Sequence, residues 1–346
     1  MITQRALARR LGLSQSTVSL ALRNSPLIPK ETKERVRQAA EKEGYHPSPL
    51  VSTLMEHIRG GKAVKDHACL GILVNARTEQ EWLTVHDSYR QQYRAIKRQA
   101  EMRGYSTECF FLAGGDLSDE RIDQIMNARG IPGIILAHGY EECDRTPRIN
   151  WNRYSCVMSG YSWKFFSGDR IAPHYKKNVE HIFSELRRRG YRRIGFCLSK
   201  NVTERSESAF LAAYFVCQHQ LESANKIPLF IGQPGEVSRS TFTKWFHRWK
   251  PDALIGRDGC EAIWLNDMGM EPGRDIGLAC MFRHSHSNFS SIDENHEIIG
   301  ELLVDRVAAH IMHNNKGVHR HPVLSLVTGS WWEGVTAPVR KSARSL

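Results

Sequence analysis

Residues 3–24 read TQRALARRLGLSQSTVSLALRN, and this stretch decides the fold of the first part of the chain. Helical spacing places apolar residues on one face of each of two short segments: Leu7 and Leu11, then Val18 and Leu22. Gly12 lies between the segments, where a tight turn needs a residue without a Cβ atom. Ser14 stands where it can cap the second helix. The stretch therefore predicts a helix-turn-helix, an arrangement that can place its second helix, residues 15–23, in the major groove of DNA.

The charge of this region favours DNA as its partner. Short helix pairs also occur in helical proteins that never touch nucleic acid, so the pattern alone leaves both interpretations open. Through Lys62 the chain has 11 Lys and Arg residues against 5 Asp and Glu, and no acidic residue precedes Glu31. Neutralisation of phosphates supplies most sequence-independent affinity for DNA, so a basic module of this size is the expected footprint. A solvated basic surface is the alternative.

Length and composition describe an ordinary globular protein with several domains. The 346 residues predict two or three domains, and the hydrophobic and charged contents are 41% and 25%. We expect no signal peptide, no membrane span and a cytoplasmic location. Eight scattered cysteines without a C-x-x-C pair indicate core residues in a reducing compartment.

Two further helices are predicted before the region of alternating strands and helices begins. One runs from Lys30 to Glu43. The other is a linker helix opened by Ser48-Pro49 and closed by Gly60-Gly61, with an apolar stripe formed by Leu50, Leu54 and Ile58. A lone helix this short is marginal in water, so we expect its stripe to pack on a second subunit's helix or on DNA. An ordinary linker helix that rests on its own domain is the alternative.

From residue 68 onward, strands alternate with amphipathic helices. The predicted strands are 69–74, 107–112, 133–136, 156–158, 193–198, 229–231, 252–255, 276–280 and 323–328, and the predicted helices are 89–104, 119–128, 179–190, 210–220, 238–249, 260–268 and 298–312. This alternation predicts an α/β fold with parallel, doubly wound sheets in two lobes. Ligands bind such sheets at the carboxyl ends of the strands, so a cleft between the lobes is the expected pocket.

Several segments together resemble the lac repressor/gal repressor family of bacterial transcription regulators. They are Ala6-Leu-Ala-Arg-Arg-Leu-Gly-Leu-Ser-Gln-Ser-Thr-Val-Ser19, Thr32–Val36, Gly44–Pro47, Leu54, Gly190–Phe196 and Pro251–Ile255. The resemblance implies a three-helix helix-turn-helix domain (1–46), a hinge helix and linker (47–62) and a periplasmic-binding-protein-like core (66–336). It divides the core into lobe 1, about 66–165 plus 294–322, and lobe 2, about 166–293 plus 323–336. A polar tail, 337–346, follows.

The resemblance also implies a homodimer that binds a palindromic double-stranded operator, in most cases as a repressor. The residues expected to contact DNA are Thr3, Gln4, Gln15, Ser16, Thr17, Ser19, Leu20, Arg23 and Leu54. Gln15 and Ser16 match base-contacting positions, and Thr17 and Ser19 lie near phosphates. Leu20 stands where many members have arginine, so a thymine methyl contact is open to it and a guanine contact is not. Leu54 and its symmetry mate would wedge into the minor groove.

For the core, the resemblance implies a small effector between the lobes, most often a sugar. The candidate effector-binding residues are Arg205, Arg257, Asp258 and Arg283. A helix cap for Asp258 and a surface position for Arg205 are the alternatives. The family's Gly-x-Asp-Asp is absent, and Cys280-Met-Phe-Arg283 stands in its place. A pocket that loses a carboxylate and gains an arginine would prefer an anionic or differently substituted ligand.

No pattern indicates catalysis, a cofactor or a metal. There is no G-x-S-x-G, no P-loop and no Cys/His constellation with catalytic spacing. The pairs His284/His286 and His319/His321 lack a nearby Cys or carboxylate pattern, so metal binding is not expected. Two alternatives to the regulator stay open: a small-molecule sensor without operator specificity, and an α/β enzyme fused to a helical domain.

Overall fold

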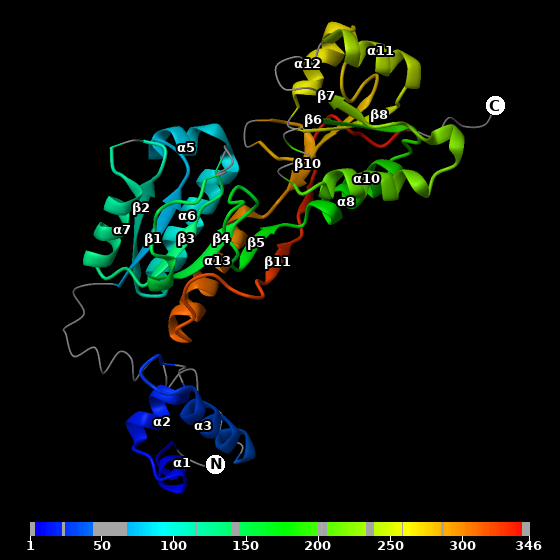
Figure 1. The fold of residues 1–346 in the computed structure, drawn as a ribbon. Coiled ribbons are helices and arrows are strands. Elements are labelled where there is room, and N and C mark those ends of the chain that lie inside the picture. The colour runs from blue at the N-terminus through cyan, green and yellow to red at the C-terminus, as the bar shows by residue number, and fades with distance from the viewer. Residues whose placement is uncertain are drawn as a thin grey trace.

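The N-terminal unit is a three-helix bundle. The computed structural model describes residues 4–22, 25–43, 68–114, 116–139, 145–199, 202, 206–232, 239–257, 259–284 and 287–340 (Figure 1). The bundle consists of α1 (Gln4–Leu11), α2 (Gln15–Leu22) and α3 (Lys30–Lys42). Its core is formed by Leu7, Val18 and Val36, each fully buried, together with alanines 8, 21 and 40. The predicted linker helix lies outside the described residues.

The turn between α1 and α2 has the predicted chemistry. Gly12 has a φ of +64°, a left-handed conformation that side chains with a Cβ rarely adopt. The hydroxyl of Ser14 accepts a hydrogen bond from the Thr17 backbone N–H at 3.0 Å, which caps α2. Arg35 of α3 donates to the Leu11 carbonyl at 2.7 Å and so satisfies the end of α1.

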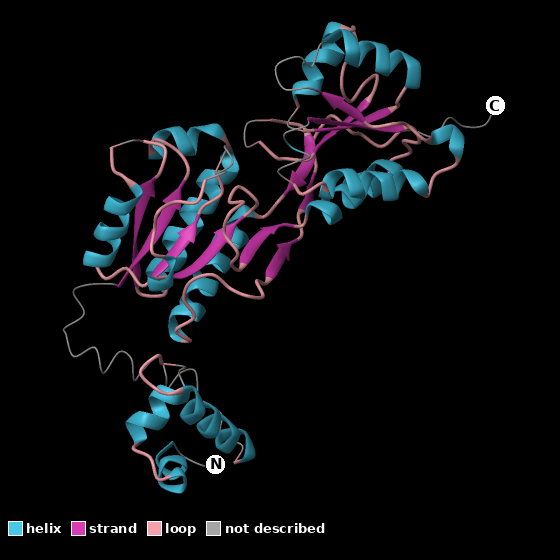
Figure 2. Cartoon of the chain, in the orientation of Figure 1, coloured by secondary structure: helices cyan, strands magenta, loops and turns pink. Residues whose placement is uncertain are grey.

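The first lobe is built on a six-stranded parallel sheet with the order β11-β5-β4-β3-β1-β2. The strands are β1 (Ala68–Val74), β2 (Tyr105–Phe111), β3 (Gly133–Leu136), β4 (Ser155–Ser159), β5 (Arg170–Pro173) and β11 (Leu324–Val327). α6 (Asp87–Met102) and α13 (His296–Met312) pack on one face, α7 (Asp119–Ala128) covers the other, and α5 (Glu79–Val85) precedes α6. Helices on both faces make this a doubly wound lobe (Figure 2).

The second lobe repeats this plan. Its sheet has the order β12-β10-β9-β8-β6-β7, parallel except for the antiparallel β12. The strands are β6 (Ile194–Ser199), β7 (Phe230–Gly232), β8 (Ala253–Gly256), β9 (Gly277–Cys280), β10 (Ser290–Asp293) and β12 (Ser330–Trp332). α8 (Tyr175–Arg188) and α10 (Ala209–His219) cover one face, and α11 (Arg239–Trp249) and α12 (Cys260–Asp267) the other.

The expected division between the lobes needs two corrections. Within the described residues, the chain passes between the sheets three times: after β5, after β10 and after β11 (Figure 1). Residues 166–173 and 323–327 were expected in lobe 2, but β5 and β11 pair with each other in the first sheet. Both strands are short and lie close to the crossover points, so alternation of strands and helices did not indicate which sheet they join.

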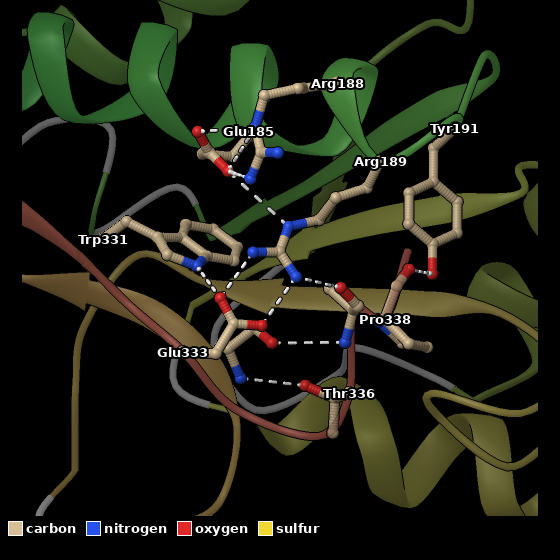
Figure 3. Close-up of polar contacts among 10 residues, drawn as sticks. Glu185, Arg188, Arg189, Tyr191, Trp331, Glu333, Thr336 and Pro338 are labelled. Carbon is tan, nitrogen blue, oxygen red and sulfur yellow. Dashed lines mark hydrogen bonds and ion pairs between the residues drawn. The ribbon is translucent and has the colours of Figure 1, made fainter. Parts of the chain in front are cut away.

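A buried arginine attaches the C-terminal segment to lobe 2 (Figure 3). Arg189, at the end of α8, is 4% exposed and donates to both carboxylate oxygens of Glu333, at 2.7 and 2.5 Å. It also donates to the Ala337 carbonyl at 2.8 Å and stacks on Trp331 at 4.8 Å. This bidentate pair, together with the side chain of Trp331, anchors the chain end to α8.

Candidate DNA-binding face and ligand cleft

The start of α2 presents polar side chains to solvent. Gln15 and Ser16 are exposed in the first turn, and Thr17 and Leu20 are half-buried. Ser19, expected near a phosphate, is 7% exposed because it lies on the side of α2 that carries Val18 into the core. Gln15 and Ser16 are therefore the expected contact residues that the fold leaves most available to a partner.

The three-helix bundle also carries exposed basic residues. Arg9 and Arg10 at the end of α1 and Arg37 of α3 are exposed, and α1 and α2 contain no acidic residue. Arg10 forms an ion pair with Glu43, and Arg37 with Glu34 at 2.7 Å. An exposed helix N-terminus on a bundle that carries basic residues is a suitable surface for a polyanion.

Several expected site residues cannot be placed. Thr3, Arg23, Leu54, Arg205 and Asp258 lie outside the described residues, as does the side chain of Gln4.

A cavity of about 180 Å³ opens between the two lobes. The residues that line it come from both sheets and from the crossovers: Val85, His86, Ser88, Tyr89, Gln92, His138, Ser159, Gly160, Pro173, Tyr175, Val202, Ser206, Phe210, Arg257, Phe282, His284, Glu294 and His296. The cavity lies beyond the carboxyl ends of strands such as β4, β5 and β9, where an open α/β sheet is expected to bind ligands.

The floor of this cleft is polar and buried. Ser159, after β4, donates to the Gln92 side-chain oxygen at 2.9 Å, and the two residues are 1% and 2% exposed. Glu294 and His296 flank the crossover into α13, with His296 Nε2 and a Glu294 oxygen 2.9 Å apart. His296 Nδ1 is buried without a hydrogen-bond partner among the described residues. The floor therefore combines a carboxylate, an amide and an imidazole, groups that both donate and accept hydrogen bonds.

Aromatic rings form the cleft wall. Tyr175 and Phe210 of lobe 2 lie 4.5 Å apart between ring centroids, and Phe210 lies 6.0 Å from Phe282. His86 of lobe 1 approaches Phe282 at 6.2 Å and His284 at 4.4 Å, so the rings continue across both lobes. An apolar wall above a polar floor is the usual composition of a small-molecule site.

The two effector candidates that are described differ in position. Arg257 lines the cleft, as expected. Arg283 does not line the main cavity, because its guanidinium bonds Asp293 at 2.5 Å and lies 3.4 Å over the Trp332 ring. The segment after β9 lacks the family's carboxylates, but Glu294, after β10, supplies a carboxylate to the cleft. Arg283 is thus neutralised by Asp293 and supplies no free cation for an anionic ligand in the main cavity.

Sequence reasoning missed the floor of the cleft. Gln92 falls within a predicted helix that also contains apolar residues, and nothing in its spacing separates it from a surface glutamine. Glu294 and His296 follow β10, a strand of four residues that the pattern did not reveal. The feature that could have revealed Glu294 and His296 is the polar run Asp293-Glu-Asn-His296 directly after the apolar Ile292.

Comparison with known proteins shows a family to which the N-terminal part of the chain is similar. Residues 5–48 match the family model described as "Bacterial regulatory proteins, lacI family". They include the described helix-turn-helix. This similarity to the lacI family covers the N-terminal part of the chain. That family is described as one of regulatory proteins.

Two relatives are similar to parts of this chain. The HTH-type transcriptional regulator GalS of Salmonella typhimurium is 28% identical over 145 residues, which cover 39% of this chain and 42% of GalS. The HTH-type transcriptional regulator AscG of Escherichia coli is 43% identical over 54 residues, 16% of each chain. The matched segments thus span less than half of either relative.

Solved structures show the same fold along nearly the whole chain. A transcriptional regulator CelR-cellobiose complex has a TM-score of 0.58 at 14% identity and covers 97% of this chain and 100% of its own. The lac repressor dimer bound to operator and the anti-inducer ONPF has a TM-score of 0.55 at 16% identity. The match covers 97% of this chain and 99% of the lac repressor chain. In the part of the chain that is described, no helix has both the length and the apolar character of a membrane span.

Proposed function

We propose that this chain is a homodimeric, cytoplasmic transcriptional repressor that binds a palindromic operator and responds to a carbohydrate-like effector. The observation that carries the proposal is the pairing of an exposed α2 N-terminus, in a basic helix-turn-helix, with a core whose cleft spans two lobes. The lac repressor dimer bound to operator supports the assignment of DNA as partner, because it shares this fold.

In this proposal, α2 lies in the major groove and Gln15 and Ser16 contact base edges. A glutamine side chain can bond adenine N6 and N7 together, and such a contact contributes about 1–3 kcal/mol of discrimination. Gln15→Ala should therefore relax operator preference, whereas Gln38→Ala, an exposed glutamine on α3, should not. Binding competition with selected and scrambled duplexes measures the difference, and equal losses for both variants would count against α2 as the reading helix.

The cleft favours a neutral polyhydroxylated ligand. The Glu294 carboxylate repels an anion but accepts hydrogen bonds from hydroxyl groups, and it is bonded through only one oxygen within the described part of the chain. The amide of Gln92 offers a donor beside it, and the aromatic wall can cover the apolar face of a sugar ring. The CelR-cellobiose complex, with the same fold, supports a sugar as the class of ligand.

Ligand binding would change operator affinity by favouring one arrangement of the two lobes. A ligand that contacts residues of both lobes has different affinities for an open and a closed cleft, so it shifts the equilibrium between them. Calorimetry with neutral sugars and sugar acids tests the ligand class. The proposal expects binding only among the neutral sugars; preference for the acids would contradict it.

One alternative is a sensor whose helix-turn-helix does not select sequences. Such a protein would bind every duplex equally and would lose affinity steeply with salt. Preference for one selected palindrome distinguishes the repressor from this sensor.

A further inference from the structure

A second cluster of polar side chains lies in lobe 1, away from the cleft, and joins three separate segments. Asp169 precedes β5, His310 lies near the end of α13, and His319 follows α13 in the stretch that leads to β11. One Asp169 oxygen lies 3.1 Å from His310 Nε2, and the other lies 2.9 Å from His319 Nδ1. The three potential ligand atoms all lie within 4.8 Å of one another.

This cluster is buried and firmly held. The exposed fractions of the side chains of Asp169, His310 and His319 are 4%, 8% and 15%. The backbone of His319 is fixed by hydrogen bonds with Ser167, at 2.8 Å from its N–H and 3.2 Å to its carbonyl. His319 Nε2 is buried without a partner among the described residues. A buried carboxylate that faces two buried or half-buried imidazoles is more than an ordinary surface ion pair.

We propose that Asp169, His310 and His319 form a binding site for a divalent transition metal ion of the Zn²⁺ type. Two imidazole nitrogens and one carboxylate oxygen are ligands that Zn²⁺ takes in proteins. Metal–ligand bonds of about 2.0–2.2 Å place neighbouring ligand atoms about 3.3 Å apart in tetrahedral geometry. The separations of 2.9 and 3.1 Å, each measured to a different Asp169 oxygen, approach this spacing. All three ligand atoms lie within 4.8 Å of one another, so an ion would draw them closer together.

The ion would take the place of the N–H protons that now lie between each imidazole and Asp169. Each neutral ring then carries its proton on the other nitrogen, so no net proton release is required. Three protein ligands leave a fourth position for water. The ion would tie the stretch between α13 and β11 to the base of the first sheet.

The positive charge of Arg306 should weaken metal binding, and this provides a second test of the proposal. Arg306 Nε donates to the Asp169 oxygen that faces His310, at 2.6 Å. The guanidinium orients the carboxylate, but its positive charge lies near the ion and must weaken binding. Removing this charge in Arg306→Gln should therefore tighten metal binding, an effect opposite to that expected if Arg306 and the histidines form only a structural hydrogen-bond network.

The test is a titration of the untagged full-length protein with Co²⁺ and Zn²⁺. We expect one ion per chain and a Co²⁺ visible absorption band typical of tetrahedral ligation. His310→Gln and His319→Gln should each weaken binding by at least about tenfold. His321→Gln should not, because His321 is exposed two residues further along. Bound Zn²⁺ should raise the midpoint of thermal unfolding of the wild type but not of the two histidine variants.

Absence of metal binding by the wild type would overturn the proposal. Equal binding by His310→Gln, His319→Gln and the wild type would also overturn it, since the ion would then lie elsewhere, for example on the cleft histidines. If the histidine variants fail to fold, X-ray absorption of the Zn²⁺-loaded wild type decides. Two imidazoles and an oxygen in the first shell support the site, and any other ligand set contradicts it.

Discussion

At the scale of single residues, Glu294 is the side chain on which effector chemistry depends most. Glu294→Gln keeps the size of the side chain but removes the charge that attracts hydroxyl donors and repels anions. Hydrogen bonds to a charged group contribute about 1.5–3 kcal/mol, so we expect sugar affinity to fall by at least about tenfold. Operator binding without effector should not change. Calorimetry and gel-shift titration measure the two effects, and an unaltered sugar affinity would remove Glu294 from the site.

A second residue-scale prediction concerns pH. The hydrogen bonds of Glu333 with Arg189 hold its pKa below the ordinary value of 4.5. A lowered pKa stabilises the folded state when the pH is above 4.5. This contribution to stability is lost as the pH falls through the lowered pKa. Glu333→Gln should therefore lower the unfolding midpoint at neutral pH, and the gap to the wild type should close below about pH 4.5.

Thermal unfolding across a pH series checks this expectation. Glu271→Gln is the matched control, because Glu271 forms a surface ion pair with Arg274, whose side chain is 66% exposed. Surface pairs contribute about 0–1 kcal/mol, so this change should have little effect. A gap for Glu333→Gln that stays constant from pH 7 to pH 3 would contradict the ion-pair explanation.

At the scale of elements, the helix-turn-helix depends on very few core side chains. Leu7 is fully buried against α2 and α3, and truncating a buried leucine to alanine costs about 2–5 kcal/mol. A unit this small has little stability to lose, so Leu7→Ala should unfold it and abolish specific DNA binding. The lobes should stay folded and bind effector normally. Leu27→Ala, at a leucine that is 79% exposed, is the control.

Circular dichroism measures the loss of folded helix, and calorimetry measures whether the lobes still bind effector. Retained operator affinity in Leu7→Ala would show that α1–α3 do not form the DNA-binding unit.

The linker gives a further prediction at this scale. If Leu54 wedges into the minor groove, Leu54→Ala should lower operator affinity while lobe folding stays intact. Bending of the DNA should fall in parallel, as measured by energy transfer between dyes at the two ends of the duplex. An unchanged affinity would exclude the wedge.

The elements show which features the sequence could predict. The bounds of α2 and α3 were predicted to within one residue, because Gly12 and Ser14 mark the turn. The first helix was predicted without bounds, from Leu7 and Leu11 on its inner face. Strands β5, β10 and β12 were missed: each has four residues or fewer and lies beside a crossover. The family resemblance predicted Arg257 in the cleft. It could not predict that Asp293 holds Arg283, since that contact depends on tertiary packing.

At the scale of the whole molecule, effector and operator must influence each other reciprocally. If an effector changes operator affinity by some factor, the operator changes effector affinity by the same factor. Calorimetric titration of a neutral sugar, with and without bound operator duplex, should therefore give two different affinities. Their ratio should match the ratio of operator affinities measured with and without sugar, and equal affinities in the two titrations would deny coupling between cleft and DNA.

The central claim is that α2 of a dimer reads a specific palindrome, and selection of duplexes from a random pool tests it most directly. The full-length protein should enrich a two-fold symmetric sequence and bind it about 10³-fold or more tighter than a scrambled duplex at physiological salt. Affinity for both duplexes should fall steeply with salt. Enrichment of no sequence, or equal affinity for the selected and scrambled duplexes, would contradict the claim.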